Sequence, residues 1–404
     1  MSIDYNVESL EVHQKSRGKL SICAKTPIKN MYDMSVLYTP GVAEPCRHIA
    51  KDKKLAYDLT MKHNTVAIVS DGTRVLGLGD IGPEAALPVM EGKALIMQQF
   101  ADIDAFPICL DEKDPDKIVE IVKAIAPNFG AINLEDISTP KVFHIESRLT
   151  KELDIPVFHD DQHGTAVVVL AGLINAIKLT KKIKTKSHKK VAAIQIESVR
   201  IGIVGSGAAG YGIAKLLHAY GFRDMVVFDS KGALHKNRTD LVDYKKDLAS
   251  FTNLSDFKGK LYEFKDAEII ISAASPGALP LETLKSMKKP NIVFALANPV
   301  SEISLEQAKE LEIDIFGTGR SDYPNQINNS VCFPGFLRAL LDLRITKVTD
   351  KMKIAAAEGI AASLPESQLS KDKIVPDPFE PTLVENIKKA VEKKQLMAKV
   401  RQYV

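Results

Sequence analysis

The stretch 200-RIGIVGSGAAGYGIAKLLHAYGFRDMVVFDSKG-232 decides the fold of the second half of this chain. A β-branched run ends at Val204, a turn with the spacing G-x-G-x-x-G follows, and an apolar helical pattern begins within that turn. Such glycines permit a tight turn and let a pyrophosphate approach the free N–H groups at the helix N-terminus. We therefore expect a dinucleotide-binding βαβ unit whose cofactor contacts are Gly205, Ser206, Gly207, Ala208, Ala209 and Gly210.

The next strand of this unit ends in an acidic residue, Asp229, at the separation usual for bonding the 2′-hydroxyl of the adenosine ribose. A carboxylate at this place should repel a 2′-phosphate, which favours NAD over NADP. Lys231, Lys236 and Arg238 follow closely and could contact a phosphate. NAD is therefore the expected cofactor, and NADP stays open.

Short apolar runs alternate with amphipathic stretches on both sides of the dinucleotide unit, which is typical of α/β folds with parallel sheets. We expect an N-terminal α/β substrate domain over 1–160, a Rossmann-type doubly wound NAD(P)-binding domain over 161–346, and C-terminal helices over 347–404 that pack on the other domains. The expected strands outside the quoted stretch are 65–72, 105–114, 131–137, 155–158, 268–272, 291–299 and 313–319, and the expected helices are 85–101, 115–129, 166–179, 347–364 and 382–400.

A lysine-rich tract, 180–199, separates the long apolar helix from the dinucleotide unit. Lysines at a helix C-terminus complement its dipole, and such runs are usually solvated. We interpret this tract as a linker loop rather than an anion-binding patch.

Carboxylates follow several of the strands expected in the first half: 111-DEKD-114, Glu135-Asp136 and Asp160-Asp161. Open α/β sheets bind their ligands at the carboxyl ends of the strands, so side chains from the last two pairs could converge on one cation. Oxygen ligands without histidine or cysteine at zinc spacing suit Mg²⁺ or Mn²⁺. The alternative is that Asp136 and Asp161 cap helices, which we consider the weaker explanation for four carboxylates in two pairs.

Composition narrows the class of protein. A chain of 404 residues is long enough for two or three domains. Its net charge of +3 gives no reason to expect a nucleic acid or an acidic membrane as partner. No cysteine pair has metal or redox spacing, so we expect reduced, buried thiols. With no signal peptide and no apolar run of membrane-spanning length expected, cytoplasm is the predicted location.

Several motifs together resemble the malic enzyme family. They occur in that family's order and extend from about Ser16 to the end of the chain. The segment 181–190 looks longer than the family's usual linker. The motifs are Tyr38-Thr39-Pro40-Gly41-Val42-Ala43, 71-DGTRVLGLGD-80, Glu91-Gly92-Lys93-Ala94, Asn133-Leu134-Glu135-Asp136, 159-HDDQHGT-165, 295-ALANP-299 and 328-NNSVCFPG-335.

The resemblance implies a role for each matching residue. Glu135, Asp136 and Asp161 should bind the divalent cation. Lys93 should be the general base and Tyr38 the general acid, with Asp160 in a supporting role beside Lys93. By the same resemblance, Arg74 should hold a malate carboxylate, Asn298 and Asn329 should contact malate or the nicotinamide, and Thr165 should contact the cofactor. The family's short-chain members are dimers, so a homodimer is expected, and either subunit could supply Tyr38 to a given site.

The implied reaction is oxidative decarboxylation of L-malate to pyruvate and CO₂ with reduction of NAD(P). An amine can take the hydroxyl proton of a 2-hydroxy acid if burial and nearby cations lower its pKa. A metal can stabilise the enolate left by CO₂, and a tyrosine can return a proton to C3. Three alternatives stay open: malolactic decarboxylation to lactate, malate dehydrogenation without decarboxylation, which needs no metal, and a catalytically silent dinucleotide sensor.

Overall fold

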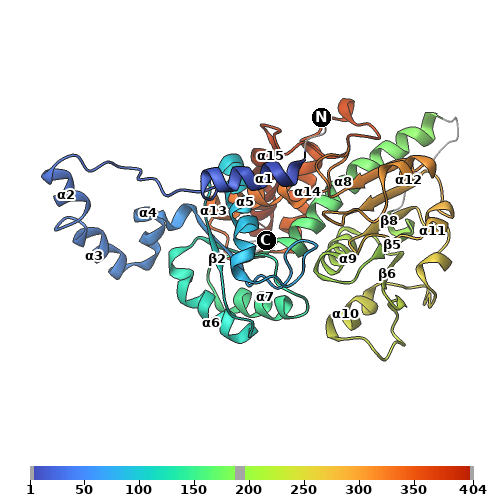
Figure 1. Cartoon of the computed structure of the whole chain (residues 1–404), viewed down its shortest axis with the longest axis horizontal. Helices are drawn as coiled ribbons and strands as arrows, with labels where there is room; N and C mark the ends of the chain where they lie inside the picture. Colours follow the sequence, from blue (N-terminus) through green and yellow to red (C-terminus); the bar gives the residue numbers. More distant parts are fainter. Residues whose placement is uncertain (1–3, 187–195, 401–404) are drawn as a thin grey trace.

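The computed structural model describes residues 4–186 and 196–400 of the chain. Two sheets lie inside a body of helices, and a helical arm projects from one end (Figure 1). The expected fold class, α/β with a Rossmann-type sheet and a helical C-terminal segment, is confirmed. The domain limits at 160 and 346 stay predictions. The centre of the lysine-rich tract, 187–195, lies outside the described residues.

The first sheet has the strand order β2-β1-β3-β4, with all neighbours parallel. Successive side chains of β1 face opposite sides: Ala67 and Val69 pack with α6 and α7, whereas Val66 and Ile68 pack with α5 and α8. Burial on both faces explains why these strands read as continuous apolar runs. The bounds are β1 Thr65–Ser70, β2 Asp104–Cys109, β3 Ala131–Leu134, β4 Val157–His159, α5 Pro83–Ala101, α6 Pro115–Ile125, η3 Ala126–Asn128, α7 Lys141–Glu152 and α8 Asp160–Lys186.

The carboxylates of 111–114 follow strand β2, as expected, and the last of them, Asp114, caps a helix. Strand β2 ends at Cys109, five residues before Asp114. The Asp114 side chain caps α6 and accepts hydrogen bonds from the backbone N–H groups of Asp116 and Lys117 at 2.8 and 3.2 Å. This carboxylate therefore stabilises a helix N-terminus instead of facing a ligand.

The second sheet has the order β10-β9-β8-β5-β6-β7, parallel except for the short β7. The chain runs from β5 to β6 on one side and then crosses to β8 on the other, so the strand order reverses at β5. Ligands of doubly wound sheets bind at this switch point. The bounds are η4 Ile196–Ser198, β5 Ile201–Val204, α9 Ala208–Tyr220, β6 Met225–Asp229, β7 Gly232–Ala233, α10 Asp243–Phe251, η5 Leu261–Glu263, β8 Ile269–Ser272, α11 Leu281–Lys285, β9 Ile292–Ala295, α12 Leu305–Glu310, β10 Ile315–Thr318 and η6 Asn329–Val331.

Helix α8 joins the two sheets. It begins at Asp160, not at the expected position 166, because the polar residues after β4 already form its first turn. Contrary to the expectation that no apolar run reaches membrane-spanning length, Asp160–Thr180 is long and apolar enough to cross a membrane, yet 72% of it is buried inside the protein. Its apolar side chains share one core cluster with residues of both sheets. The helix is therefore part of the protein core.

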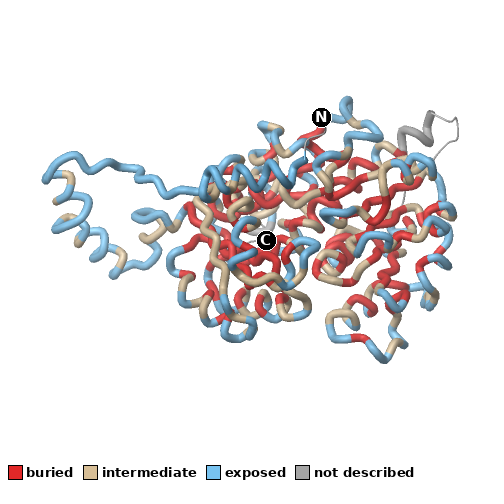
Figure 2. Tube along the Cα trace, in the orientation of Figure 1, coloured by how far each residue is buried: buried red, intermediate tan, exposed pale blue. Residues whose placement is uncertain are grey.

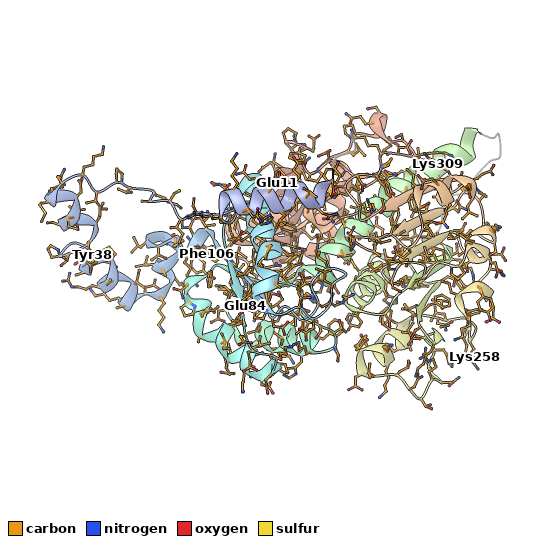
Figure 3. The ribbon with its side chains drawn as sticks, viewed as in Figure 1. Glu11, Tyr38, Glu84, Phe106, Lys258 and Lys309 are labelled. Atoms are coloured by element: carbon orange, nitrogen blue, oxygen red, sulfur yellow. The ribbon has the colours of Figure 1, made fainter. Side chains whose placement is uncertain are left out.

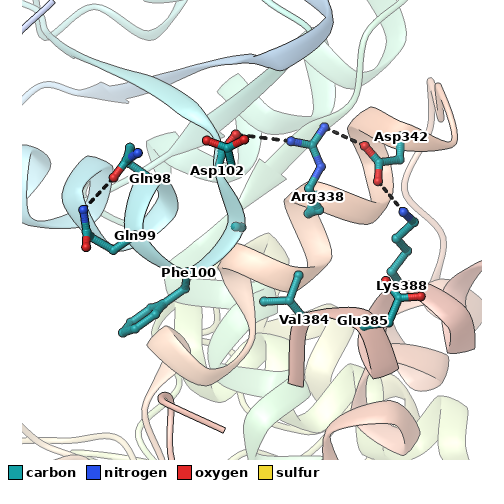
Figure 4. Close-up of a pocket in the computed structure, with 10 residues that line it drawn as sticks. Gln98, Gln99, Phe100, Asp102, Arg338, Asp342, Val384, Glu385 and Lys388 are labelled. Atoms are coloured by element: carbon teal, nitrogen blue, oxygen red, sulfur yellow. Dashed lines mark hydrogen bonds and ion pairs between the residues drawn. The ribbon is translucent and has the colours of Figure 1, made fainter. Parts of the chain in front are cut away.

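The C-terminal helices pack back onto the body. Helix α13 contacts α5, α14 contacts α8, and α15 contacts both α13 and α14. At the outer edge of this packing, Arg338 pairs with Asp342 at 2.7 Å, and Lys388 reaches the other oxygen of Asp342 at 2.7 Å (Figure 4). The pair between Lys388 and Asp342 ties α15 to α13, and Arg338 supports Asp342 from within α13. The bounds are α13 Phe333–Asp342, α14 Asp350–Ala362, η7 Glu366–Gln368 and α15 Leu383–Val400.

The N-terminal arm, residues 4–63, is almost entirely exposed (Figure 2). Its first helix, α1, lies along the body, and α2 and α3 project from it (Figure 1). None of the residues of α1 to α4 is buried, and side chains such as Ile22, Met31 and Tyr32 are 91%, 77% and 76% exposed. The expectation of four buried thiols is wrong here, because Cys23 and Cys46 lie on this arm and are exposed. The bounds are α1 Tyr5–Ser16, α2 Met31–Leu37, α3 Ala43–Lys51, η1 Lys53–Leu55, α4 Ala56–Leu59 and η2 Met61–Asn64.

Candidate active site

A cleft of about 600 Å³ opens between the carboxyl ends of the two sheets. Its walls combine the loops after β1 and β3, the first turns of α8, and the loops after β8 and β9. Most residues that the resemblance singled out therefore meet in one place. The predicted residues that line the cleft are Arg74, Lys93, Glu135, Asp136, Asp161, Thr165, Ala209, Asn298 and Asn329.

Three carboxylates converge on one side of this cleft. One oxygen from each of Glu135, Asp136 and Asp161 lies within 4.8 Å of the others. Glu135 follows β3 and Asp161 follows β4, and these strands are parallel neighbours, so their ends present both side chains at the same edge. Asp136 adopts a left-handed backbone conformation with φ of 52°, and its N–H donates to Asp161 Oδ2 at 3.0 Å.

The same carboxylates fit a divalent cation chemically. Asp136 Oδ2 is buried and has no hydrogen-bond partner among the described residues, an arrangement that is costly unless a cation compensates it. The alternative that Asp136 caps the next helix does not hold, because α7 begins at Lys141 with Pro140 at its N-cap. An all-oxygen set of this kind suits Mg²⁺ or Mn²⁺.

Burial and mutual repulsion shift the pKa values of the three carboxylates. Burial raises the pKa of Glu135 well above its ordinary value, although Lys93 opposes the shift. Burial, followed by the charge of Asp161, raises the pKa of Asp136 to about 7. Burial acts on Asp161 in the same direction, but the nearby His159 and Lys93 outweigh it and lower that pKa to about 2. Burial and mutual repulsion thus favour the protonated forms of Glu135 and Asp136 when no cation balances their charge.

Lys93 projects from α5 into this acidic cluster. Its ammonium contacts Asp160 Oδ2 and lies 2.8 Å from Glu135 Oε1, above the ring of Phe333 at 4.6 Å from the centroid. The predicted pairing of Asp160 with Lys93 is therefore present. Burial lowers the pKa of Lys93, but Asp160, Glu135 and Asp161 outweigh burial and raise it overall. We expected a lowered pKa; the cation-free carboxylates reverse its direction.

Tyr38 lies far from Lys93 in this chain. It forms the C-cap of α2 on the projecting arm, is 63% exposed, and does not line the cleft (Figure 3). Asp160 and the carboxylate trio thus meet Lys93 within one chain, whereas the expected general acid does not.

The glycine-rich turn has the geometry that a pyrophosphate requires. Gly205 has φ of +97°, and a Cβ at Gly210 would overlap the Gly205 carbonyl oxygen. Helix α9 begins at Ala208 with Gly207 as N-cap and no side-chain cap, which leaves its first N–H groups free. Ala209, in the first turn, lines the cleft together with Thr165 of α8. Ser206 is buried at the turn.

Asp229 ends β6 as expected, but its carboxylate already has several partners. Arg238 donates to both oxygens at 2.8 and 3.1 Å, and Lys245 donates to Oδ2 at 2.8 Å. The backbone N–H of Lys231 donates to Oδ1 at 2.9 Å. Burial raises the pKa of Asp229, yet these hydrogen bonds outweigh burial and lower it. Lys245 lies 16 residues later in the chain, on α10, where no sequence pattern pointed to a contact with Asp229.

A second buried network supports the first turn of α8. His163 Nε2 lies 2.6 Å from Glu146 Oε1, and Lys353 Nζ lies 3.2 Å from His163 Nδ1. Glu146 is on α7 and Lys353 on α14, so one histidine connects three helices beside Asp160 and Asp161. His163 lies within the 159-HDDQHGT-165 motif, whose pattern alone indicates no role for this residue.

Comparison with known families decides the relationship. The family description "Malic enzyme, N-terminal domain" matches residues 17–150, and "Malic enzyme, NAD binding domain" matches residues 162–393. The chain belongs to the malic enzyme family. The resemblance seen in the motifs is thereby confirmed.

Individual relatives agree over nearly the whole chain. The chain is 50% identical to the bifunctional malic/malolactic enzyme of Bacillus subtilis, over 96% of this chain and 92% of that protein. It is also 50% identical to the NAD-dependent malic enzyme of Geobacillus stearothermophilus, over 93% of this chain and 76% of that protein. The crystal structure of the NAD-dependent malic enzyme of Thermotoga maritima superposes with a TM-score of 0.88 at 44% identity, covering 97% of this chain and 99% of that one.

Proposed function

We propose that this chain catalyses the oxidative decarboxylation of L-malate to pyruvate and CO₂, with a nicotinamide dinucleotide as hydride acceptor. The observation that carries the proposal is the single cleft in which Lys93, the carboxylate trio and the dinucleotide turn face one another. Malate dehydrogenation without decarboxylation needs no metal, so it would not require the three carboxylates. The names of the relatives are consistent with the same reaction.

Within the cleft, Glu135, Asp136 and Asp161 would hold a divalent cation. Such a cation would supply positive charge that stabilises the C2 oxygen and lowers the pKa of Lys93. Arg74, at the cleft wall, would hold one malate carboxylate. Asn298 and Asn329 also line the cleft, where they would orient malate against the nicotinamide.

Proton transfer would begin at Lys93. The neutral amine would accept the C2 hydroxyl proton while hydride leaves C2 for the cofactor, giving a 2-keto acid. Asp160 contacts the same amine and would fix its direction, so we assign it a supporting role. The C3–C4 bond would then break to release CO₂, and a phenol would give its proton to C3.

We assign that phenol to Tyr38 of a second subunit. Tyr38 lies outside the cleft of its own chain, and the arm that bears it exposes apolar side chains on α2. A protein surface of this kind usually marks an interface. In a symmetric dimer the two arms would exchange, so that each arm brings Tyr38 to the partner's Lys93. The site would then be complete only in the dimer.

For the cofactor, we propose that both NAD and NADP are accepted. The negative charge of Asp229 is balanced by Arg238 and Lys245, which weakens the repulsion of a 2′-phosphate that the sequence suggested. Both cations adjoin Asp229, so they would be available to pair with a phosphate on the ribose.

The test is an assay of the purified protein with L-malate, Mn²⁺ and either NAD or NADP, following reduced nicotinamide, pyruvate and CO₂ together. Equal formation of all three supports the proposal. Lactate and CO₂ without reduced cofactor would instead establish malolactic decarboxylation, the second candidate, which the bifunctional Bacillus subtilis relative favours. A folded protein that binds dinucleotide but forms no product would favour a sensor.

A further inference from the structure

Two loops that belong to different strands are joined next to the cleft. The first, 71–82, follows β1 and carries Arg74; the second, 135–140, follows β3 and carries Asp136. Because β1 and β3 are parallel neighbours, with Val69 opposite Leu134, both loops begin at the carboxyl edge of the sheet and lie side by side. Their mutual position then depends on what connects them beyond the strands.

Thr73 provides the connection through its hydroxyl. Thr73 Oγ1 accepts a hydrogen bond from the backbone N–H of Ser138 at 3.0 Å, across the gap between the loops. The same hydroxyl donates to Asp71 Oδ1 at 2.6 Å. Next to this bond, the N–H of Arg74 donates to the carbonyl oxygen of Asp136 at 3.0 Å. The Thr73 side chain and one backbone hydrogen bond thus hold the two loops together where Arg74 and Asp136 adjoin.

Asp71 fixes the Thr73 hydroxyl in turn. Its carboxylate is 1% exposed at the end of β1, and Oδ1 also accepts the backbone N–H of Thr73 at 3.1 Å. The ammonium of Lys141, the first residue of α7, pairs with Asp71 Oδ2. The connection therefore runs from β1 through Thr73 to the second loop, and through Lys141 to the helix that follows it.

A simple turn would not need this arrangement. A turn at 71–73 requires only the bond from the Thr73 N–H to Asp71, and a solvated aspartate would suffice for it. The buried ion pair and the bond from Ser138 extend beyond the turn and reach the loop that carries a carboxylate of the trio. Loss of the hydroxyl would leave the Ser138 N–H without its partner.

We propose that Thr73 is a positioning residue that couples malate binding to metal binding. It would hold the loop 71–82, which carries Arg74, at a fixed distance from the loop 135–140, which carries Asp136. This inference rests on the proposed function, since it deepens the roles assigned to those two residues. Neither the family descriptions nor the motif resemblance assigns Thr73 a role.

The test compares Thr73→Val with Thr73→Ser. Valine has the same shape but no hydroxyl, whereas serine keeps it. Valine should raise the KM for malate and the Kd for Mn²⁺ about tenfold each, because two hydrogen bonds are lost. The kcat at saturating malate and Mn²⁺ should change less than about twofold, as expected for a loss of uniform binding. Serine should behave like the unsubstituted protein.

Direct binding measurements separate this role from a general loss of structure. Mn²⁺ binding, followed by electron paramagnetic resonance of the free ion without substrate, should weaken in the valine variant, whereas NAD binding should not change. Thr73→Ala serves as a second hydroxyl-free variant if valine prevents folding. Unchanged Mn²⁺ affinity and KM in a folded hydroxyl-free variant would overturn the inference, as would a parallel loss of NAD binding.

The outcomes also distinguish this inference from the proposed function. If the unsubstituted protein fails to convert malate, the proposed function fails, yet the Mn²⁺ titration of the valine and serine variants still tests the connection. If malate is converted normally and Thr73→Val equals Thr73→Ser in every readout, the inference alone is wrong.

Discussion

Two inactive variants should restore activity when they share a dimer. Tyr38→Phe removes the proposed acid on the arm, and Lys93→Gln removes the proposed base in the cleft. Loss of a general acid or base lowers turnover by about 10²- to 10⁴-fold, so each homodimer should retain about 1% of normal activity or less.

The expected magnitude follows from the symmetry of the exchanged arms. In a heterodimer of the two variants, one site combines both substitutions, and the other combines an unsubstituted Lys93 with an unsubstituted Tyr38. A two-fold dimer therefore keeps one intact site, which predicts about half of the normal activity per dimer. If Tyr38 served its own chain, every site would carry one substitution and activity would stay near the homodimer level.

The assay needs co-expression of the variants with two different affinity tags and purification through both. Reduced nicotinamide formed from L-malate then reports activity per purified heterodimer. The doubly substituted chain, co-expressed with an unsubstituted one, is the matched control: it puts one substitution in each exchanged site and should be inactive. Activity in that control, with none in the mixed heterodimer, would refute the exchanged arrangement.

Three further outcomes follow from the site. Asp161→Asn should abolish Mn²⁺-dependent turnover and weaken Mn²⁺ binding while NAD binding persists; loss of NAD binding with unchanged Mn²⁺ affinity would contradict the assignment. The pKa of Asp136, raised to about 7 by burial and by Asp161, means that a proton occupies this carboxylate at lower pH. Mn²⁺ must displace that proton, so its affinity should fall about tenfold per pH unit below about pH 7 in titrations from pH 5 to 8, and a flat profile would disprove the reasoning. Lys245→Gln should lower kcat/KM for NADP about tenfold and barely change it for NAD, because one charged partner of the 2′-phosphate is lost; Lys246→Gln, whose lysine pairs with Asp243 instead, is the control that should leave both values unchanged.

The sequence was sufficient for the sheets and for the edge at which the site lies. Parallel strands that are buried on both faces have continuous apolar, β-branched sequences, which makes them recognisable. Residues directly after such strands, for example Glu135, must lie at the carboxyl edge of the sheet. The cleft that contains Lys93, Asp136 and Asn298 could therefore be foreseen in outline from local patterns and the family's motifs.

Features that depend on distant contacts could not be foreseen. Lys245 contacts Asp229 because the fold brings α10 next to the end of β6, and no local sequence pattern predicts that contact. The start of α8 was misplaced because polar residues after a strand resemble a loop, although tertiary contacts hold them in a helical turn. The position of Tyr38 depends on how the arm leaves the body, which its own residues do not specify.

The continuity of α8 has a practical consequence for building hybrid enzymes. Its first turn presents Asp160 and Asp161 to the first sheet, and its middle packs against α9 of the second. A crossover between homologous parents at position 160 would pair a foreign helix with the native β3 and β4 strands. Parental sequence kept intact as far as Thr180 would carry the whole acidic pair together with its supporting helix. The later junction would in turn pair this helix with foreign α9 and α14, so recombination libraries made from this chain should retain function most often when the parents are alike where α8 packs against both.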